Sequence, residues 1–333
     1  MRHEQTTAPR TLVPETVTMG IVLILVAMAL ITANDMIIKR LSDTYPLHQI
    51  VLIRSLIGMS FASVFLMFEG GLRCLRTRRP GLHVIRSLML VGANLFFFTA
   101  IATVTLAEAS AVFFIFPMVI ALLQWPVLGV PVGPRRLASI GLGFVGVLVI
   151  LAPWGGGGNA APAWALALPV AGAVCYALMQ LLTRKLGDEM PAAGLAVYSQ
   201  GGFIVVCAVT GLVLGDGRFL GDTDNASLSF LLRAWVWPSA EDWWLFGLVG
   251  CAIGLVAYAM SQAYRVADPA TIAPFEYVAL PLAVFWGVVI FGDIPDLRTA
   301  LGILLIAGAG IYVYIRERKV GTETIVAGNR TPR

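Results

Sequence analysis

Long apolar runs with few charges recur along the whole sequence, and they limit its fold more than any other feature. A helix needs about 20 mostly apolar residues to cross a bilayer, and ten segments approach or exceed this length: residues 17–38, 47–68, 81–103, 107–128, 136–153, 163–183, 192–214, 242–260, 269–291 and 297–315. Only 13% of the residues are charged, whereas soluble domains average about 25%. We therefore expect an all-α integral membrane protein with ten transmembrane helices.

The positions of Lys and Arg predict how these helices are oriented. With a cytoplasmic N-terminus, most of these residues fall in segments that face the cytoplasm, including the run 73–79 and the pair Arg184 and Lys185. Lys and Arg are enriched in cytoplasmic loops. We therefore expect a multi-pass protein of the cell inner (plasma) membrane, with both termini in the cytoplasm.

Two pairs of similar segments indicate an internal repeat. The segment after the first span reads "KRLSDTYP" (39–46), and the segment after the sixth reads "RKLGDEMP" (184–191). Further on, "LAEASAV" (106–112) aligns with "VADPATI" (266–272). Each unit contains five spans. Because five is an odd number, the second copy crosses the membrane in the opposite sense. Inverted repeats of this kind are typical of secondary transporters.

The repeat divides the chain into two units with short flanking parts. We expect two inverted five-helix repeats, with a Gly-rich outer linker between them and a cytoplasmic tail at each end. The expected boundaries are 1–16 for the first tail, 17–153 for the first repeat, 154–162 for the linker, 163–315 for the second repeat and 316–333 for the second tail. The linker sequence "GGGGN" lacks the Gly-Lys pair of a phosphate-binding loop.

Ionisable residues inside the predicted spans are few, and each is a candidate for the functional site. A charge at mid-bilayer costs on the order of 2.5–3.5 kcal/mol, so such residues usually face a cavity or a partner. Glu276, next to Tyr277, lies between Pro274 and Pro281, and proline can open a helix toward a cavity. Either these two residues bind a substrate or Glu276 carries a coupling proton. The alternative is a structural carboxyl paired with Arg86 or a neighbouring hydroxyl.

A second group of candidates lies where we expect the first helix to end. Asn34 is followed by Asp35, which precedes Lys39 by four residues, or about 6 Å along a helix. Arg54 in the second span is the expected partner of Asp35. The two charges either contact a substrate or gate, or form an interfacial ion pair. Gln180, which corresponds to Asp35 in the second repeat, lies near the opposite membrane face.

Further polar and aromatic residues suit the wall of an amphipathic cavity. Tyr176 and Gln180 share a helix face through their i, i+4 spacing, as do Tyr258 and Gln262. The remaining candidates for the wall are Asn94, Phe98 and Phe114. Packing between helices is the alternative role of the aromatic residues. For Arg86 we favour a structural role in which its side chain extends to the cytoplasmic interface.

Small residues form smooth faces on the fifth and tenth spans, namely Gly141, Gly143, Gly146, Gly302, Ala307, Gly308 and Gly310. Such faces let helices pack closely, either inside the protein, which we favour, or in a homodimer. The four cysteines and three histidines are scattered, so we expect no disulfide framework and no metal site. We expect no cofactor either, and no nucleic-acid partner, because the chain lacks a basic stripe with interleaved aromatics. The expected partners are membrane lipid and a small-molecule substrate.

Three stretches resemble a known family: "ANDMIIKRLSDTYPLHQIVLIR", "LAEASAVFFIFPMVIALLQWPVLGVPVGPRRLASIGLGFVGVLVI" and "ADPATIAPFEYVALPLAVFWGVVIFGDIPDLRTALGILLIAGAGIYV". Over about residues 17–315 the chain is similar to EamA-type members of the drug/metabolite transporter superfamily. The phrase "APFEY" and the opening "ND" look most like a branch that includes bacterial riboflavin and S-adenosylmethionine importers. Relatives often have Glu where this chain has Val130, whereas the second repeat keeps Asp293. We interpret this acidic motif as structural.

The resemblance implies a central cavity between two bundles that opens alternately to each side. It also implies a small organic solute that is moved with a proton or by exchange, and the mixed polar and aromatic candidates suit an amphipathic, ring-bearing metabolite. A polytopic membrane enzyme is one alternative, but it would need a nucleophile, a base or a metal cluster. A membrane scaffold is another, and it would not need an inverted repeat. A channel is disfavoured because no ring of like charges is apparent. We therefore predict a transporter and no enzymatic activity.

Overall fold

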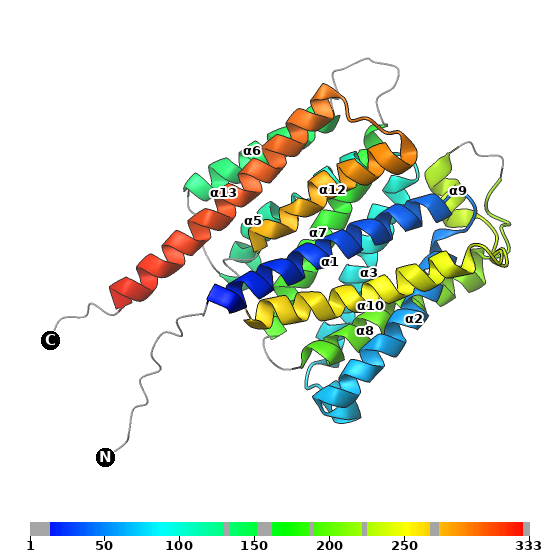
Figure 1. Cartoon of the computed structure of the whole chain (residues 1–333), viewed down its shortest axis with the longest axis horizontal. Coiled ribbons are helices and arrows are strands. Elements are labelled where there is room, and N and C mark those ends of the chain that lie inside the picture. The colour runs from blue at the N-terminus through cyan, green and yellow to red at the C-terminus, as the bar shows by residue number, and fades with distance from the viewer. Residues whose placement is uncertain are drawn as a thin grey trace.

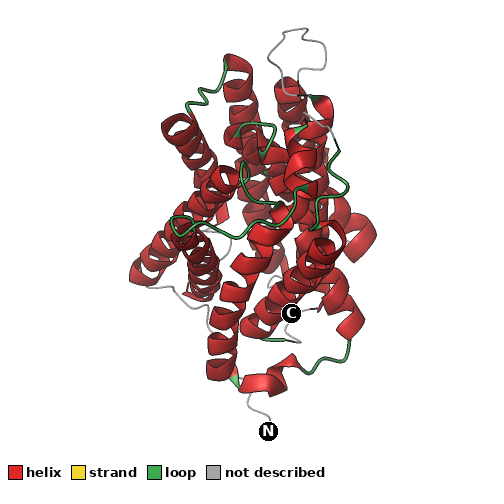
Figure 2. Cartoon of the chain, turned by 90° about the vertical axis from the view of Figure 1, so that its right-hand side faces the viewer, coloured by secondary structure: helices red, strands yellow, loops and turns green. Residues whose placement is uncertain are grey.

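The computed structural model describes residues 14–129, 134–151, 162–186, 190–221, 225–266 and 273–328, and within these ranges it contains helices and no β-strand. Figure 2 shows helices almost throughout this part of the chain. The predicted linker (154–162), except Pro162, lies outside the described residues, and so do most of the segment "VADPATI" and most of the first tail. The described part of the chain is therefore all-helical, as predicted.

The helices follow one another with short connections (Figure 1). The part up to the predicted linker forms α1 (Pro14–Leu41), α2 (Leu47–Glu69), a 3-10 turn η1 (Gly71–Leu75), α3 (Pro80–Ile101), α4 (Leu106–Phe113), α5 (Phe116–Leu128) and α6 (Pro134–Leu151). The part after it forms α7 (Ala163–Leu186), α8 (Ala192–Leu214), α9 (Ala226–Leu232), α10 (Trp243–Val266), a 3-10 segment η3 (Ala273–Val278), α12 (Ala279–Trp286), a π-helical turn η4 (Gly287–Phe291) and α13 (Leu297–Gly328).

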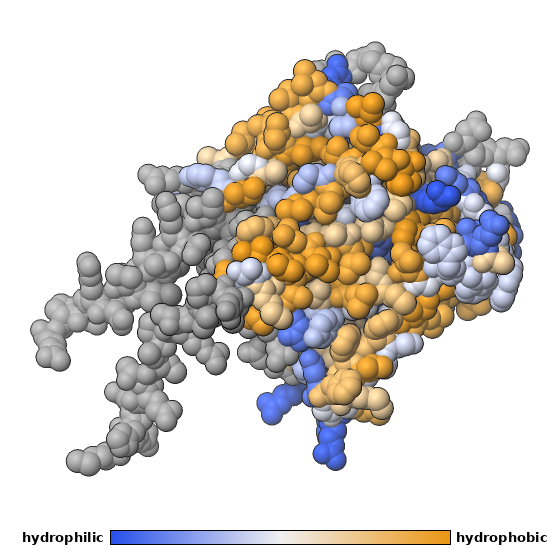
Figure 3. Space-filling model, viewed as in Figure 1, coloured by the Kyte–Doolittle hydropathy of each residue, from blue (hydrophilic) through white to orange (hydrophobic). Residues whose placement is uncertain are grey.

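Seven helices are long and apolar enough to cross a membrane within the described ranges: Val17–Leu41, Leu47–Glu69, Pro80–Ile101, Leu106–Val127, Trp164–Leu186, Ala192–Leu214 and Trp243–Met260. Three shorter apolar helices, Ile140–Ile150, Phe275–Phe291 and Leu297–Tyr312, coincide with the predicted fifth, ninth and tenth spans. Apolar residues cover most of the face in Figure 3, and hydrophilic residues lie mainly at its edges. The chain is therefore a multi-pass membrane protein.

Local sequence signals explain several helix ends. Thr105 and Glu108 form a capping box at the start of α4: Thr105 Oγ1 accepts from the N–H of Glu108, and Glu108 Oε2 accepts from the N–H of Thr105 at 3.0 Å. Gly129 ends α5 and Gly292 ends η4, and both adopt the left-handed conformation that favours glycine. The capping box and Gly129 thus set the two ends of the fourth span, and Gly292 sets the end of the ninth.

Three predicted helices differ in detail from the observed ones. Helix α1 continues to Leu41, so Asn34 and Asp35 do not end it. The fourth span breaks between α4 and α5, where Pro117 in the first turn of α5 lacks the N–H that a continuous helix needs. The ninth span begins as the 3-10 segment η3, which contains Pro274, and ends as a π-helical turn. The sequence indicated an opening only in the ninth span.

Four pairs of helices make the most extensive contacts: α1 with α10, α3 with α7, α2 with α8, and α6 with α13. In Figure 1, α6 and α13 lie together at one edge, and α1 lies between α12 and α10. Gly146 of α6 faces Gly302 of α13, where a side chain would collide with the opposite helix. These two small residues therefore support packing inside the protein, as we favoured.

One end of the bundle is covered by residues 225–242, which we call the outer cap. We call this the outer end after the predicted orientation; it is the end where α1 stops and α2 begins. The amide of Gln49 pairs with the backbone of Val236, donating to its carbonyl at 2.7 Å and accepting from its N–H at 3.3 Å. Tyr45 Oη donates to Asp242 Oδ2 at 2.7 Å. The outer cap thus fixes the connection between α1 and α2.

Candidate functional site

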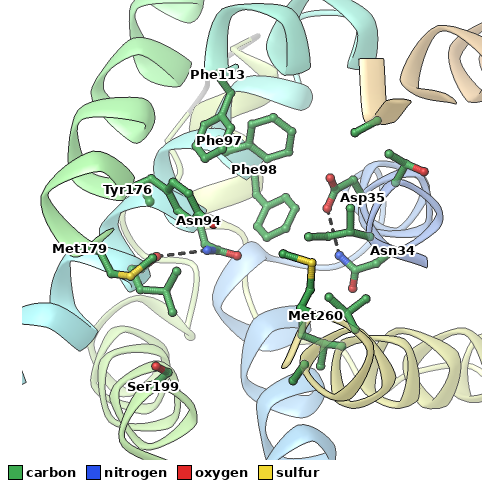
Figure 4. A pocket seen from close by; sticks show the side chains of 18 of the residues that line it. Asn34, Asp35, Asn94, Phe97, Phe98, Phe113, Tyr176, Met179, Ser199 and Met260 are labelled. Carbon is green, nitrogen blue, oxygen red and sulfur yellow. Dashed lines mark hydrogen bonds between the residues drawn. The ribbon is translucent and has the colours of Figure 1, made fainter. Parts of the chain in front are cut away.

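A cavity of about 380 Å³ lies among the helices and is lined by side chains from both predicted repeats. It lies between α1, α3, α7, α8 and α10, and the interruptions of the fourth and ninth spans border it. The sequence candidates that line it are Asn34, Asp35, Arg54, Asn94, Phe98, Phe114, Tyr176 and Glu276. Figure 4 shows Asn34 and Asp35 on α1 facing Asn94 and Tyr176 across the cavity.

Asn34 and Asp35 form the polar edge of α1. Asn34 Nδ2 donates to Asp35 Oδ1 at 3.0 Å, while Oδ1 of Asn34 is buried without a hydrogen-bond partner. Because α1 runs on to Leu41, the two residues lie well inside the helix, about 9 Å before its end. They therefore face the cavity and not an interfacial helix terminus.

Arg54 is buried between two aromatic rings. Its guanidinium carbon lies 5.4 Å from the ring centroid of Phe98 and 5.3 Å from that of Phe203. Its Nη2 makes one long hydrogen bond of 3.5 Å to Asn94 Oδ1, and its Nε has no partner. Arg54 is 2% exposed, so the rings and one weak bond leave part of its donor capacity unused.

The predicted partnership of Asp35 and Arg54 is electrostatic. The two groups are close enough to affect each other's charge, but they do not form one of the direct ion pairs found among the described residues. Opposite charges attract over several ångströms inside a protein. The cavity therefore contains an acidic and a basic side chain that form no direct ion pair and that a ligand can contact.

Glu276 stands on η3, which packs against α1, and it lines the cavity. It interacts electrostatically with the hydroxyls of Tyr176 and Tyr277. Tyr277 does not line the cavity: its ring lies 5.5 Å from that of Phe114, and its hydroxyl is buried beside Gly310. Glu276 therefore lines the cavity and Tyr277 lies behind its wall, and the roles predicted for both residues stay predictions.

The other candidates lie outside the cavity wall. Gln180 Nε2 donates to Tyr176 Oη at 3.4 Å, as their spacing indicated. Arg86 does not extend to an interface, because it is buried and donates to Thr183 Oγ1 at 2.7 Å and to Ser199 Oγ at 3.2 Å. Tyr258 stacks on Phe65 at 5.3 Å on an exposed face, and Gln262 is half-buried.

The wall also contains residues that the sequence analysis missed: Phe97, Ser110, Phe113, Phe116, Ser199, Gln200 and Phe203. Gln200 had a usable signal, since it is an uncharged polar residue inside an apolar span. The phenylalanines had none, because in a membrane helix a lining ring and a packing ring look alike in sequence. The ring of Phe116 meets that of Tyr176 edge-on at 4.8 Å, so the aromatic side of the cavity is continuous.

A family model matches part of the first half of the chain. Residues 18–152 match the model of the EamA-like transporter family. This part of the chain is similar to an EamA domain. Over nearly the whole chain, a crystal structure described only as that of a protein superposes with a TM-score of 0.57 at 19% identity, covering 92% of this chain and 98% of the other. That likeness concerns the fold alone.

Curated relatives of this chain are transporters. Riboflavin transporters of Brucella anthropi and Rhizobium johnstonii are 27% and 29% identical to it, over 74% and 75% of this chain and 81% and 75% of theirs. An S-adenosylmethionine uptake transporter of Rickettsia prowazekii is 21% identical over 90% of this chain and 94% of its own length. The resemblance to the drug/metabolite transporter superfamily is therefore confirmed.

Proposed function

We propose that this protein is a secondary transporter that moves a small, amphipathic, ring-bearing metabolite across the cell inner membrane by alternating access. The observation that carries the proposal is the central cavity, which places Asp35, Arg54 and Glu276 among aromatic side chains inside a membrane protein. Charges at this depth are costly unless they serve a solute, an ion or a partner. The transport is coupled to protons or to exchange.

The pairing of helices supports two inverted repeats, 17–153 and 163–315. In such a repeat α1, α2, α3 and α6 correspond to α7, α8, α10 and α13. Exchanging each helix with its counterpart turns the contact of α1 with α10 into that of α7 with α3, and it leaves the pairs α2 with α8 and α6 with α13 unchanged. All four of these contacts exist. A pseudo-twofold axis through the cavity, as in other inverted-repeat transporters, would produce this pattern.

The two interrupted spans also correspond to each other. The break between α4 and α5 and the 3-10 segment η3 both border the cavity, and Gly129 and Gly292 end the two spans in the same conformation. Discontinuous helices at the interface of two repeats are common at transporter binding sites. We assign the ends of the solute path to these two spans.

The residues divide into roles according to their place in the cavity. We assign substrate contacts to Asn34, Asp35, Arg54 and Asn94, and ring stacking to Phe98, Phe114 and Tyr176. Glu276 either binds the substrate or carries the coupling proton. The cavity volume of about 380 Å³ lies within the range of about 300–1,000 Å³ that is typical of small-molecule sites.

The first compounds to test are those named for the relatives, riboflavin and S-adenosylmethionine. Both termini are proposed to be cytoplasmic, following the distribution of Lys and Arg. The proposal gives the chain no enzymatic role, and it needs no cofactor or nucleic acid. Lipid surrounds the helices, and a homodimer through the small-residue faces of α6 and α13 stays a prediction.

The test is a binding screen followed by a flux measurement on the same protein. Purified protein is heated with each compound of a metabolite panel that contains riboflavin and S-adenosylmethionine, and compounds that raise the unfolding temperature are carried forward. Each of them is then offered to proteoliposomes, with and without a pH gradient and with and without the same compound inside. We expect at least one compound to be taken up, and either the pH gradient or the same compound inside should accelerate its uptake. A compound that binds in the cavity but never crosses would contradict transport.

A further inference from the structure

Lys39 joins three parts of the chain at the outer end. Its Nζ donates to Asp293 Oδ2 at 3.0 Å and to the carbonyl oxygen of Val104 at 3.3 Å. The same nitrogen lies 4.7 Å from the ring centroid of Phe291. Val104 lies two residues before the fourth span, whereas Phe291 ends the ninth and Asp293 lies two residues beyond it. One side chain of α1 thus ties together the outer ends of the two interrupted spans.

This contact lies one helical turn beyond the cavity. Lys39 follows Asp35 by four residues, so the two side chains share one face of α1 and are about 6 Å apart along the axis. Asp35 and Thr32 line the cavity, and Thr32 also accepts a hydrogen bond from Trp286 Nε1 at 3.3 Å. The same face of α1 therefore meets the ninth span from Thr32 to Lys39, and separation at Lys39 would open the cavity at the outer end.

We propose that the Lys39–Asp293 ion pair is the outer gate of the solute path. When the pair is formed, the cavity is closed at the outer end, and the pair breaks whenever that end opens. The contacts to Asp293, Val104 and Phe291 break together, because all three are made by one Nζ atom. The inference rests on the proposed function, since a gate has a role only in a protein that opens to both sides.

An exposed ion pair on the same side of the protein shows why the gate pair is different. Arg218 and Asp216 are two residues apart, 3.4 Å from each other, and their side chains are 60% and 57% exposed. Such pairs contribute little to stability and report nothing about distant parts of a fold. The side chains of Lys39 and Asp293 are 15% and 28% exposed. They are far apart in the chain, so their contact depends on how the two repeats are placed.

The sequence gives the two ends of the path unequal charges. In the repeat alignment Arg184 corresponds to Lys39, and Val130, which lies outside the described residues, corresponds to Asp293. The inner counterpart of the gate pair therefore keeps the cation and lacks the acid. A contact available in only one of two states shifts the population toward that state. The empty protein thus favours the state that is closed at the outer end.

Cysteine accessibility tests the gate directly. Cys74, Cys175, Cys207 and Cys251 are replaced by Ala, and Ser110 of the cavity wall is replaced by Cys as a reporter. A membrane-impermeant maleimide is added on the side where an Asp43→Cys protein reacts. We expect slow labelling of the reporter in the parent protein. With Lys39→Met or Asp293→Asn, labelling should be about fivefold faster. This ratio corresponds to the loss of an ion pair whose free energy is near the upper limit measured for exposed pairs.

Three further variants sharpen the result. The exchange of both charges, Lys39→Asp with Asp293→Lys, is expected to return labelling to the slow rate. Val130→Asp, which supplies the missing acid, is expected to speed labelling without touching the outer end. Arg218→Met, the matched control at the exposed pair, is expected to leave the rate unchanged.

Two results would overturn the gate: unchanged labelling in both single variants, or equal acceleration by Arg218→Met. If Lys39→Met does not fold, Asp293→Asn decides alone, because it keeps the shape of the side chain. The experiments distinguish failure of the gate from failure of the proposed function. Faster labelling without flux of any solute would retain the gate and reject transport, whereas solute flux with unchanged labelling would retain transport and reject the gate.

Discussion

At the outer end of this protein, Tyr45 and Gln49 bind the outer cap through paired hydrogen bonds, whereas two buried polar atoms of the cavity have no partner among the described residues. Tyr45 and Gln49 each make two hydrogen bonds to the outer cap. In the cavity, Asn34 Oδ1 and Arg54 Nε make none. A buried polar atom without a partner costs about 1–3 kcal/mol. The contacts of Tyr45 and Gln49 hold the outer cap in place, whereas the unpartnered cavity atoms are available to a ligand or to a second conformation.

The largest expected effect is on transport when the carboxyl of Glu276 is neutralised. Glu276→Gln should lower uptake by at least about tenfold, a loss of about 1.4 kcal/mol of transition-state or binding free energy, because an amide neither carries a proton nor holds a full charge. The unfolding temperature should not fall. The loss of uptake is measured in proteoliposomes across a range of pH, and the unfolding temperature is measured by thermal unfolding. Glu241→Gln, on the exposed part of the outer cap, is the matched control, and equal uptake by both variants would remove Glu276 from the mechanism.

The next effect is a coupling between Asp35 and Arg54 in ligand binding. Asp35→Asn and Arg54→Gln should each weaken binding of a transported compound, and the double variant should lose less than the sum, with a coupling of about 1 kcal/mol. The reason is that the two groups line one cavity, where an acidic and a basic side chain attract each other. Titration of the four proteins gives the coupling. Asp35→Asn combined with Arg218→Gln is the control cycle and should be additive; additivity in the first cycle would show that the two charges act independently.

A smaller effect, on stability alone, is expected at the outer end. Tyr45→Phe removes the bond to Asp242 and the bond from the N–H of Ser239, which is 3.1 Å from Tyr45 Oη. The free energy of unfolding should fall by about 1 kcal/mol, with uptake unchanged. Tyr312→Phe, on an exposed position of α13, should change neither. If Tyr45→Phe abolished uptake in a protein of normal stability, the division between structural outer contacts and functional cavity groups would be wrong.

The smallest effect is a pH dependence at Asp242. Hydrogen bonds from Tyr45 and Ser239 hold the pKa of this carboxyl below its usual value of 3.8. A carboxyl with a lowered folded pKa stabilises the protein above its unfolded pKa, and this contribution disappears as the pH falls through the folded pKa. Thermal unfolding should therefore lose stability less steeply below about pH 4 in Asp242→Asn than in the parent protein. Identical slopes would show that the carboxyl adds nothing at the outer end.

Composition and periodic apolar runs were enough to predict the helices and the polar core of the cavity. Asp35, Arg54, Asn94 and Glu276 were found because a charged or amide side chain is rare in an apolar span, and that rarity is visible in one sequence. The same reasoning misplaced Arg86, because the sequence does not show that Thr183 and Ser199 are near enough to bind it.

Contacts between distant segments could not be predicted from the sequence. Gln49 meets Val236 and Tyr45 meets Asp242 only because the outer cap folds back over the start of α2. The break after Phe113 was missed for a different reason: the residues on both sides are apolar and aromatic, so the local pattern continues although the helix stops.

The gate, the cavity and transport all depend on two repeats that cross the membrane in opposite senses. Two cysteines can test this arrangement. In a protein without native cysteines, Asp43→Cys and Lys185→Cys place a thiol after the first and the sixth span. A membrane-impermeant maleimide added to intact cells should label residue 43, and it should label residue 185 only after the cells are permeabilised. Labelling of both residues in intact cells, or of neither, would contradict the inverted arrangement.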